Sequence, residues 1–282
     1  MAYLDRIHAC KIYQPANYVP FTVGGRQVGL VHKKTLPNLA ANPDVIEVSP
    51  DRVTLSDRWR DYRARSSAMR DVCQNLREQG LVHAWRDEPY AVRERWGQPA
   101  LLEIERGTVP LFGVEGYGVH LNGVVETPNG PNMWIGRRSK TKPTGPGKLD
   151  QIVAGGLPSN LGVFENLIKE SREEADIPAD LASQAVPIGI VSYCTETTEG
   201  LRRDVLFNYD LALPEAFTPH NTDGEIDDFY LWTMHQVIRT VRDTDEFKFN
   251  CAIIVIDFLI RRGFIKPDEP DYVSIIHGLH RN

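Results

Sequence analysis

The sequence predicts an α/β protein with a mixed sheet between helices, preceded by a smaller α/β unit. In the second half, candidate strands lie on both sides of a charged amphipathic helix at residues 163–175, and further helical segments follow. This order fits a sheet that is covered by helices. In the first half, short strand candidates surround one long helical segment. We therefore expect a small α/β N-terminal domain at residues 1–112 and a larger domain at residues 113–282.

The elements of the first half follow from short apolar runs between turn residues. We expect a strand, a Gly-Gly turn and a strand over residues 18–31, and short strands at residues 45–48, 52–55, 90–92 and 101–104. Ser56 and Asp57 are candidate caps for a helix over residues 58–80. Residues 107–116 then form the expected boundary.

The second half contains longer strand candidates and three helices. Strands are expected at residues 117–125, 132–135, 149–153, 186–193 and 204–211, and helices at residues 163–175, 234–242 and 248–262. The turn at residues 128–131 joins the first two strands as a hairpin. Pro178 ends the first helix, because proline cannot continue a helical hydrogen-bond ladder.

Composition excludes several classes of protein. The 282 residues are 41% apolar and 25% charged, with a net charge of −6, so no concentrated basic face for nucleic acid is expected. The sequence lacks an apolar run of the roughly 18 residues that a membrane span needs, and its start does not resemble a signal peptide. Four widely spaced cysteines argue against a zinc site or a disulfide framework. These features predict a cytoplasmic location.

Three carboxylates share one stripe of the helix at residues 163–175. Glu170, Glu173 and Glu174 have the i, i+3 and i+4 spacing of surface neighbours, and like charges at that distance repel one another. A hard divalent cation such as Mg²⁺ or Mn²⁺ turns this repulsion into attraction. Upstream, Gly155 and Gly156 allow the backbone to turn tightly and to approach a ligand closely. The alternative is a solvated acidic helix face.

The densest basic stretch lies between residues 137 and 148, just before the Gly-Gly pair. A loop that combines several cations with glycines is suited to binding a polyphosphate. Arg137, Lys140 and Lys142 are the candidate substrate-binding residues. The alternative is a solvated surface loop.

The segment Lys169-Glu170-Ser171-Arg172-Glu173-Glu174-Ala175-Asp176-Ile177 resembles the second half of the Nudix box, the signature of the Nudix hydrolases. The chain departs from the full box in four places. Lys169 replaces an arginine, Ser171 an apolar residue and Asp176 a glycine, and Leu161, further upstream, stands where the box has its first glutamate. Lys169 keeps a positive partner for Glu173, but it lacks the planar fork of arginine. Glu165 is expected to support the site from within the helix. The resemblance implies the Nudix α/β/α sandwich and a metal site at the three glutamates.

The stretch from Thr218 to Trp232 is similar to a further feature of the family. A glutamate seven residues before a tryptophan that opens a helix often adds a metal ligand or serves as the general base in Nudix enzymes, and Glu225 matches it. Either Glu174 or Glu225 is therefore the expected proton acceptor. The alternative for Glu225 is an acidic turn with Asp223-Gly224.

A longer string resembles one branch of the family. Arg137-Arg138-Ser139, Lys148-Leu149-Asp150 and the variant box from Glu165 to Glu170 are similar to a group related to thiamine pyrophosphokinase, which has an extra N-terminal domain. The branch implies hydrolysis of thiamine diphosphate, or of its oxidised or damaged forms, to the monophosphate and phosphate. The partner is then a small-molecule diphosphate. The N-terminal domain is expected either to shape the pocket or to support a homodimer. Two alternatives stay open: a Nudix hydrolase of an ADP-ribose-like nucleoside diphosphate derivative, and a non-catalytic Nudix-like binding module.

Overall fold

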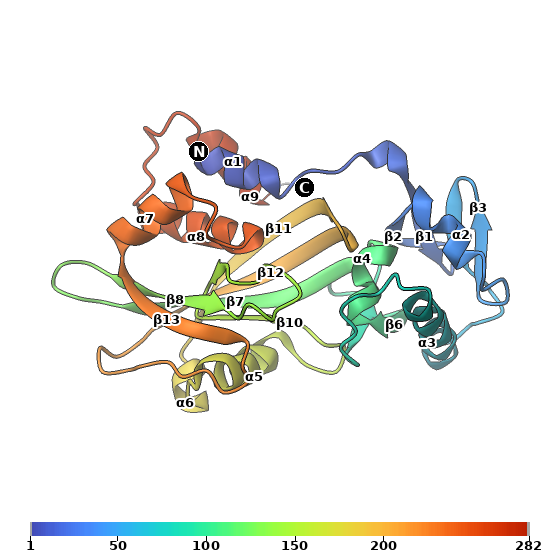
Figure 1. Cartoon of the computed structure of the whole chain (residues 1–282), viewed down its shortest axis with the longest axis horizontal. Coiled ribbons are helices and arrows are strands. Elements are labelled where there is room, and N and C mark those ends of the chain that lie inside the picture. The colour runs from blue at the N-terminus through green and yellow to red at the C-terminus, as the bar shows by residue number, and fades with distance from the viewer. Residues whose placement is uncertain (1, 281–282) are drawn as a thin grey trace.

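A mixed seven-stranded sheet forms the centre of the larger part of the molecule (Figure 1). The computed structural model describes residues 2–280. The strands of the seven-stranded sheet are β7 (Glu115–Val125), β8 (Asn132–Arg138), β9 (Leu149–Asp150), β10 (Val153–Gly156), β11 (Val186–Thr197), β12 (Gly200–Ala212) and β13 (Ile226–Thr233). Their order is β11-β12-β7-β8-β13, with β10 also paired to β7 and β9 to β8. Strands β7 and β12 are parallel, and the other pairs are antiparallel.

Helices cover both faces of this sheet. On one face lie α5 (Val163–Ala175) and α6 (Ala179–Ala182), whose apolar residues share a hydrophobic cluster with β7, β10 and β12. On the other face lie α1 (Tyr3–Ala9), α7 (Met234–Asp243), α8 (Phe249–Arg261) and α9 (Tyr272–His280) (Figure 1). Helix α8 is buried over most of its length, as expected from its almost continuous apolar sequence. The predicted α/β/α sandwich is confirmed.

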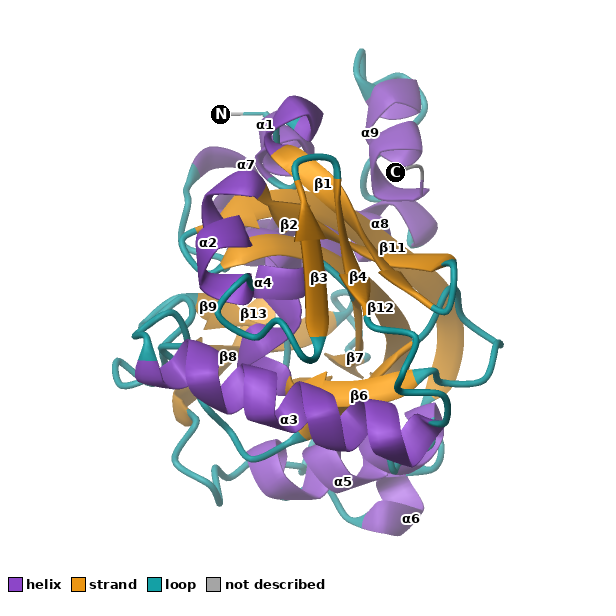
Figure 2. Ribbon diagram, turned by 90° about the vertical axis from the view of Figure 1, so that its right-hand side faces the viewer, coloured by secondary structure: helices purple, strands orange, loops and turns teal. Residues whose placement is uncertain are grey.

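Residues 18–114 form a second unit with its own hydrophobic cluster, here called the small unit. Its strands β1 (Tyr18–Val23), β2 (Arg26–His32), β3 (Ile46–Ser49) and β4 (Arg52–Leu55) form a four-stranded sheet, and β5 (Pro89–Val92) pairs with β6 (Leu102–Glu105). Its helices are α2 (Leu36–Leu39), α3 (Tyr62–Glu78) and α4 (Val109–Phe112). Figure 2 shows α3 running alongside β6 beneath the four-stranded sheet. The small unit also contains the 3₁₀ turns η2 (Lys33–Thr35) and η3 (Arg106–Thr108), and a further turn, η1 (Pro15–Asn17), directly precedes it.

Some predicted element boundaries are wrong. Helix α3 begins at Tyr62 and not at Arg58, because the Asp61 carboxylate accepts the Ala64 N–H at 2.9 Å and caps the helix there. The segment before Trp232 is not only an acidic loop: residues 226–233 form β13, which pairs with β8. Trp232 therefore lies in a strand, and helix α7 begins two residues later at Met234.

The first helix packs on the larger part of the molecule. Tyr3, Ile7 and Cys10 belong to the same cluster as the residues of α8 and α9, and the Arg6 guanidinium donates to the Val241 carbonyl at 3.1 Å. Neither α1 nor α9 was expected from the sequence. We call α1 together with residues 115–280 the large unit. The division of the chain at residue 112 stays a prediction. Among residues 2–280, no helix has the length and apolarity needed to cross a bilayer.

The docking of α1 can be tested with two isoleucines. Ile7 is 2% exposed, whereas Ile12, in the following linker, is 64% exposed. We expect Ile7→Ala to lower the free energy of unfolding by about 2–4 kcal/mol, because it leaves a cavity in the core of the large unit. The matched control Ile12→Ala is expected to change it by less than about 0.5 kcal/mol. Chemical denaturation measures both, and equal effects would contradict the placement of α1.

Candidate active site

Helix α5 is positioned by contacts at both of its ends. Its first turn follows Gly162, whose N–H donates to the Glu165 carboxylate at 3.4 Å. At its C-terminus Asp176 adopts a left-handed conformation, with φ of 52°, that usually favours glycine. Aspartate tolerates this conformation better than most residues, and its carboxylate is paired with Arg172 at 3.1 Å. The replacement of the family's glycine therefore does not disrupt the end of the helix.

The three glutamates of α5 have different environments. Glu174 is 3% exposed, and its Oε2 accepts the Ala154 N–H of strand β10 at 2.7 Å. The Glu170 side chain is also largely buried beside β10, and the Lys169 ammonium lies 3.2 Å from its Oε1. Glu173 is half-exposed and pairs with Lys169 at 2.6 Å. Lys169 therefore pairs with two of the three carboxylates.

Gly155 makes room for Glu170. Strand β10 pairs with β7 and runs past the side of α5 that carries the glutamates. A Cβ atom on Gly155 would overlap the Cγ and Cδ atoms of Glu170. Neither Gly155 nor Gly156 has the left-handed φ that favours glycine. The expected tight turn is therefore wrong, and the missing side chain itself explains why glycine occupies position 155.

Burial and mutual repulsion set the protonation of this group. Burial raises the pKa of Glu174 well above 4.5, and the nearby charge of Glu170 raises it further. Burial also raises the pKa of Glu170, although Lys169 opposes the shift. A cation between these carboxylates would relieve both effects. The donor set consists entirely of oxygen atoms, which fits a hard divalent ion such as Mg²⁺ or Mn²⁺.

Glu225 reaches the same region from the loop before β13. Its carboxylate forms an ion pair with Lys142, and its backbone carbonyl accepts the Ser139 N–H at 2.9 Å. Burial would raise the pKa of Glu225, but Lys142, Arg86 and Arg106 together lower it. The charge of Glu225 also acts on Glu174. The structure thus brings Glu225 within electrostatic reach of Glu174.

The basic loop divides between two directions. Arg137 turns away from the glutamates: its guanidinium donates to Glu246 at 2.9 Å and lies 5.9 Å from the ring centre of Tyr230. Lys140 is exposed. Arg138 and Lys142 line a pocket instead. Neighbouring residues of a strand point to opposite faces, and β8 continues to Arg138, so Arg138 occupies the place expected for Arg137.

The pocket beside β10 is strongly cationic. It is lined by seven basic residues, His83, Arg86, Arg106, Arg138, Lys142, Arg202 and Lys248, and by one acidic residue, Glu199. An adjoining hollow shares Arg106, Ala154, Arg202 and Lys248 and is lined by glycines of β7 and β10. Because the Ala154 N–H also donates to Glu174, the carboxylates and the cations meet at β10. Sequence reasoning did not select Arg138, Arg202 and Lys248, and it did not identify which residues of the small unit line the pocket.

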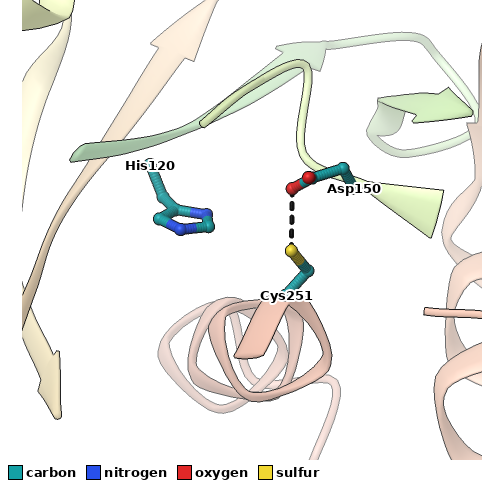
Figure 3. A group of neighbouring side chains, drawn as sticks. All are labelled: His120, Asp150 and Cys251. Atoms are coloured by element: carbon teal, nitrogen blue, oxygen red, sulfur yellow. Dashed lines mark hydrogen bonds between the residues drawn. The ribbon is translucent and has the colours of Figure 1, made fainter. Parts of the chain in front are cut away.

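A buried network holds Arg138 in place. His120, Asp150 and Cys251 converge from β7, β9 and α8 (Figure 3). Asp150 accepts from Arg138 at 2.6 Å through one oxygen and from the Cys251 thiol at 2.7 Å through the other. Burial alone would raise the pKa of Asp150, but Arg138 and Lys248 lower it to about 2.

These three side chains also have the chemistry of a metal site. Burial lowers the pKa of His120 to about 4, which keeps its imidazole neutral, and its Nδ1 lies 2.7 Å from Gln151 Oε1. The charge of Asp150, however, is already matched by Arg138 and Lys248. A cation there would be repelled by these two groups. We therefore interpret the network as support for Arg138 and Lys248 at the pocket wall.

Comparison with known proteins gives one family match and several relatives. Residues 2–116 match a family described as a domain of unknown function, DUF4743. The chain is 40% identical to Nudix hydrolase 24, chloroplastic, and 38% identical to Nudix hydrolase 20, chloroplastic, both of Arabidopsis thaliana. Each match covers 98% of this chain and 77% of the relative. Among solved structures, a MutT protein from Methanosarcina mazei aligns over 52% of this chain and 96% of its own, with a TM-score of 0.39 and 16% identity.

The buried charge of Glu174 predicts a pH-dependent stability. A folded-state pKa above the unfolded value means that stability is lost as the pH rises through the folded pKa. In EDTA at pH 8, Glu174→Gln is therefore expected to raise the melting temperature by a few degrees, about 2–4 °C per kcal/mol. The gain should vanish near pH 4.5, where the wild-type side chain is also protonated. Glu173→Gln, at the half-exposed position, is the control; a gain that is the same at all pH values would contradict the argument.

The space above Gly155 predicts a second outcome. In Gly155→Ala the new methyl group displaces the Glu170 carboxylate, so we expect Mn²⁺ binding to weaken by about tenfold or more. Gly162→Ala is the matched control, because its Cβ would meet nothing closer than 4.0 Å. Titration of Mn²⁺ followed by electron paramagnetic resonance measures both. Wild-type affinity in Gly155→Ala would show that Glu170 does not bind the ion.

Proposed function

The chain belongs to the Nudix hydrolase family, and we propose that it hydrolyses the diphosphate of thiamine diphosphate, or of its oxidised forms, to the monophosphate and phosphate. It is a pyrophosphohydrolase, as its similarity to the two plant Nudix hydrolases over nearly its whole length indicates. The thiamine substrate is the part we propose. It is supported by the branch-specific string from Arg137 to Glu170 and by the chemistry of the pocket.

One observation carries the proposal: two buried carboxylates and a pocket of cations adjoin at the same strand. Glu170 and Glu174 contact β10 from one side, while Arg138, Lys142 and Lys248 line the pocket at its other side. A diphosphate carries negative charge on both phosphate groups and suits a basic pocket. A cation held by carboxylates suits the phosphate at which the bond breaks.

We propose Mg²⁺, or Mn²⁺, as the cofactor. Glu170 and Glu174 would hold it, with Glu173 at the edge of the site, and Ala154 keeps the Glu174 carboxylate in place. When bound, such an ion neutralises phosphate oxygens and lowers the pKa of water.

The other steps belong to the residues of the chain. Arg138 and Lys142 bind phosphoryl oxygens and stabilise the negative charge that develops in the transition state. Water attacks the terminal phosphorus, and the bond from that phosphorus to the bridging oxygen breaks. Glu174 or Glu225 accepts the proton of the water. Glu225 is held as a carboxylate by Lys142, whereas the raised pKa of Glu174 makes it the stronger base.

Two further parts of the proposal concern the cell and the assembly. We propose a cytoplasmic location, because Cys10, Cys73, Cys194 and Cys251 are free thiols, as expected in a reducing compartment. The names of the two plant relatives place those proteins in the chloroplast. We also propose a homodimer that the N-terminal domain supports, and light scattering on the purified chain tests it.

Phosphate release tests the proposed function. With Mg²⁺, we expect turnover of thiamine diphosphate or its oxidised analogues, and no turnover in EDTA. Glu174→Gln is expected to lower kcat by about 100-fold or more, since it removes a charge from the site. Comparison with Glu225→Gln distinguishes the two candidate bases. The variant that lacks the true base is expected to lose the acidic limb of the pH–rate profile, whereas the other variant keeps it.

ADP-ribose belongs in the same assay. Turnover of ADP-ribose alone would keep the family and the site but overturn the thiamine assignment. Absence of turnover for every diphosphate tested would overturn the proposed substrate class. Arg137→Ala serves as a control cation, because Arg137 pairs with Glu246 outside the pocket; its kcat/KM is expected to stay within about threefold of the wild type.

A further inference from the structure

We propose that the small unit supplies one wall of the substrate pocket and that its Arg106 is a substrate-binding residue for the diphosphate. This inference rests on the proposed function, which placed the diphosphate in the cationic pocket. It assigns a role to part of the region that matches a domain of unknown function.

Arg106 lies where the two hollows of the site meet. It is the first residue of η3, directly after β6, and it lines both the cationic pocket and the adjoining hollow. Its side chain is 42% exposed, although it sits between the two units. Its Nη2 lies 3.2 Å from the position that a Cβ on Gly156 would take. The guanidinium of Arg106 therefore faces β10, the strand whose Ala154 N–H donates to Glu174.

Two residues of the small unit orient this guanidinium. The Glu88 carboxylate accepts from Nη1 at 2.7 Å, and the Glu88 carbonyl accepts the Arg106 N–H at 2.9 Å. The Tyr90 ring centre lies 5.7 Å from the Arg106 Cζ. The Glu88 carboxylate binds Nη1, and Nη2 lies on the side of Gly156. A planar fork that is held in this way is suited to bidentate binding of phosphate oxygens.

Arg106 interacts electrostatically with two carboxylates of the large unit, Glu170 and Glu225. Glu170 is among the carboxylates that favour its charged form, and Arg106 in turn lowers the pKa of Glu225. Arg86, also from the small unit, acts on Glu225 in the same direction and lines the pocket. The small unit is therefore coupled electrostatically to the carboxylates of the large unit.

Gly156 lies at the contact between the two units, where a larger residue would not fit. A Cβ on Gly156 would overlap the Tyr90 hydroxyl and lie 3.0 Å from Tyr90 Cζ. Because the φ of Gly156 lies outside the left-handed region, its backbone conformation does not require glycine. Glycine is required here because the Tyr90 hydroxyl occupies the space that a side chain would need. The second glycine of the Gly-Gly pair is thus explained by the wall that the small unit builds against β10.

Binding of a diphosphate analogue tests Arg106 independently of turnover. The probe is methylene diphosphonate with Mg²⁺, measured by calorimetry on the full chain. We expect Arg106→Ala to weaken binding by about 10-fold or more and Arg106→Lys to weaken it less, because lysine keeps the charge but loses the fork. Arg52→Ala is the control, since Arg52 lies in β4 of the same unit with a 61% exposed side chain. Equal affinity in Arg106→Ala and wild type, at unchanged melting temperature, would overturn the proposal, as would the absence of binding to the wild type.

The same variants separate this inference from the proposed function. If the wild type binds the analogue but turns over no thiamine compound, the substrate assignment fails. The role of Arg106 is then decided by whether Arg106→Ala binds the analogue more weakly than the wild type does. With an active enzyme, we expect Arg106→Ala to raise KM more than it lowers kcat, as for a residue that binds the ground state. A loss confined to melting temperature would show that Arg106 only holds β5 and β6 together.

A double-mutant cycle tests the wall itself. Gly156→Ala is expected to lower kcat/KM by about tenfold or more, because its methyl group pushes Tyr90 and Arg106 away from β10. Tyr90→Phe removes the overlapping hydroxyl, so the double variant is expected to recover to within about threefold of Tyr90→Phe alone. If the double variant is no better than Gly156→Ala, the Tyr90 contact does not explain the glycine.

Discussion

Two buried carboxylates on adjacent turns of one helix are the constraint on which the rest of this site depends. Glu170 and Glu174 repel each other and lose solvation where α5 contacts β10, which raises the pKa of both. The surrounding structure offsets this cost in several ways. The Ala154 N–H donates to Glu174, Lys169 pairs with Glu170, and Gly155 leaves the volume that Glu170 occupies. A metal ion between the carboxylates would replace Lys169 as the main counter-charge of Glu170 and would relieve the repulsion from Glu174.

The cations of the pocket come from positions that are far apart in the sequence. Arg138 is held by Asp150, which in turn is fixed by Cys251 of α8. Lys142 is held by Glu225 at the start of β13, and Arg106 by Glu88 in the small unit. Every one of these side chains has a carboxylate partner that orients it. The pocket therefore presents preorganised cations, which lose little side-chain entropy when an anion binds.

Local patterns predicted the helix α5 and its glutamates well, because i, i+3 and i+4 neighbours are fixed by helix geometry alone. The basic loop was harder to predict. Whether Arg137 or Arg138 faces the pocket depends on how far β8 extends, and the sequence indicated a hairpin that ends near Ile135. Arg106 and Tyr90 carry no local signal, since their position at Gly156 results only from the packing of two units. The strand β13 was missed because pairing with β8 outweighs its acidic composition.

The packing of α1 on α8 and α9 has a consequence for the small unit. The Cys10 thiol donates to the Phe249 carbonyl at 3.4 Å, and the Ile12 carbonyl accepts the Glu196 N–H of β11 at 2.7 Å. The chain leaves the large unit after these contacts and returns to it at β7. The small unit is thus tethered at both of its ends, like a loop closed on the larger body. Release of one tether would still leave the other, so its effective concentration at the pocket stays high. Arg106 therefore stays close to the pocket even when one of the two connections is loosened.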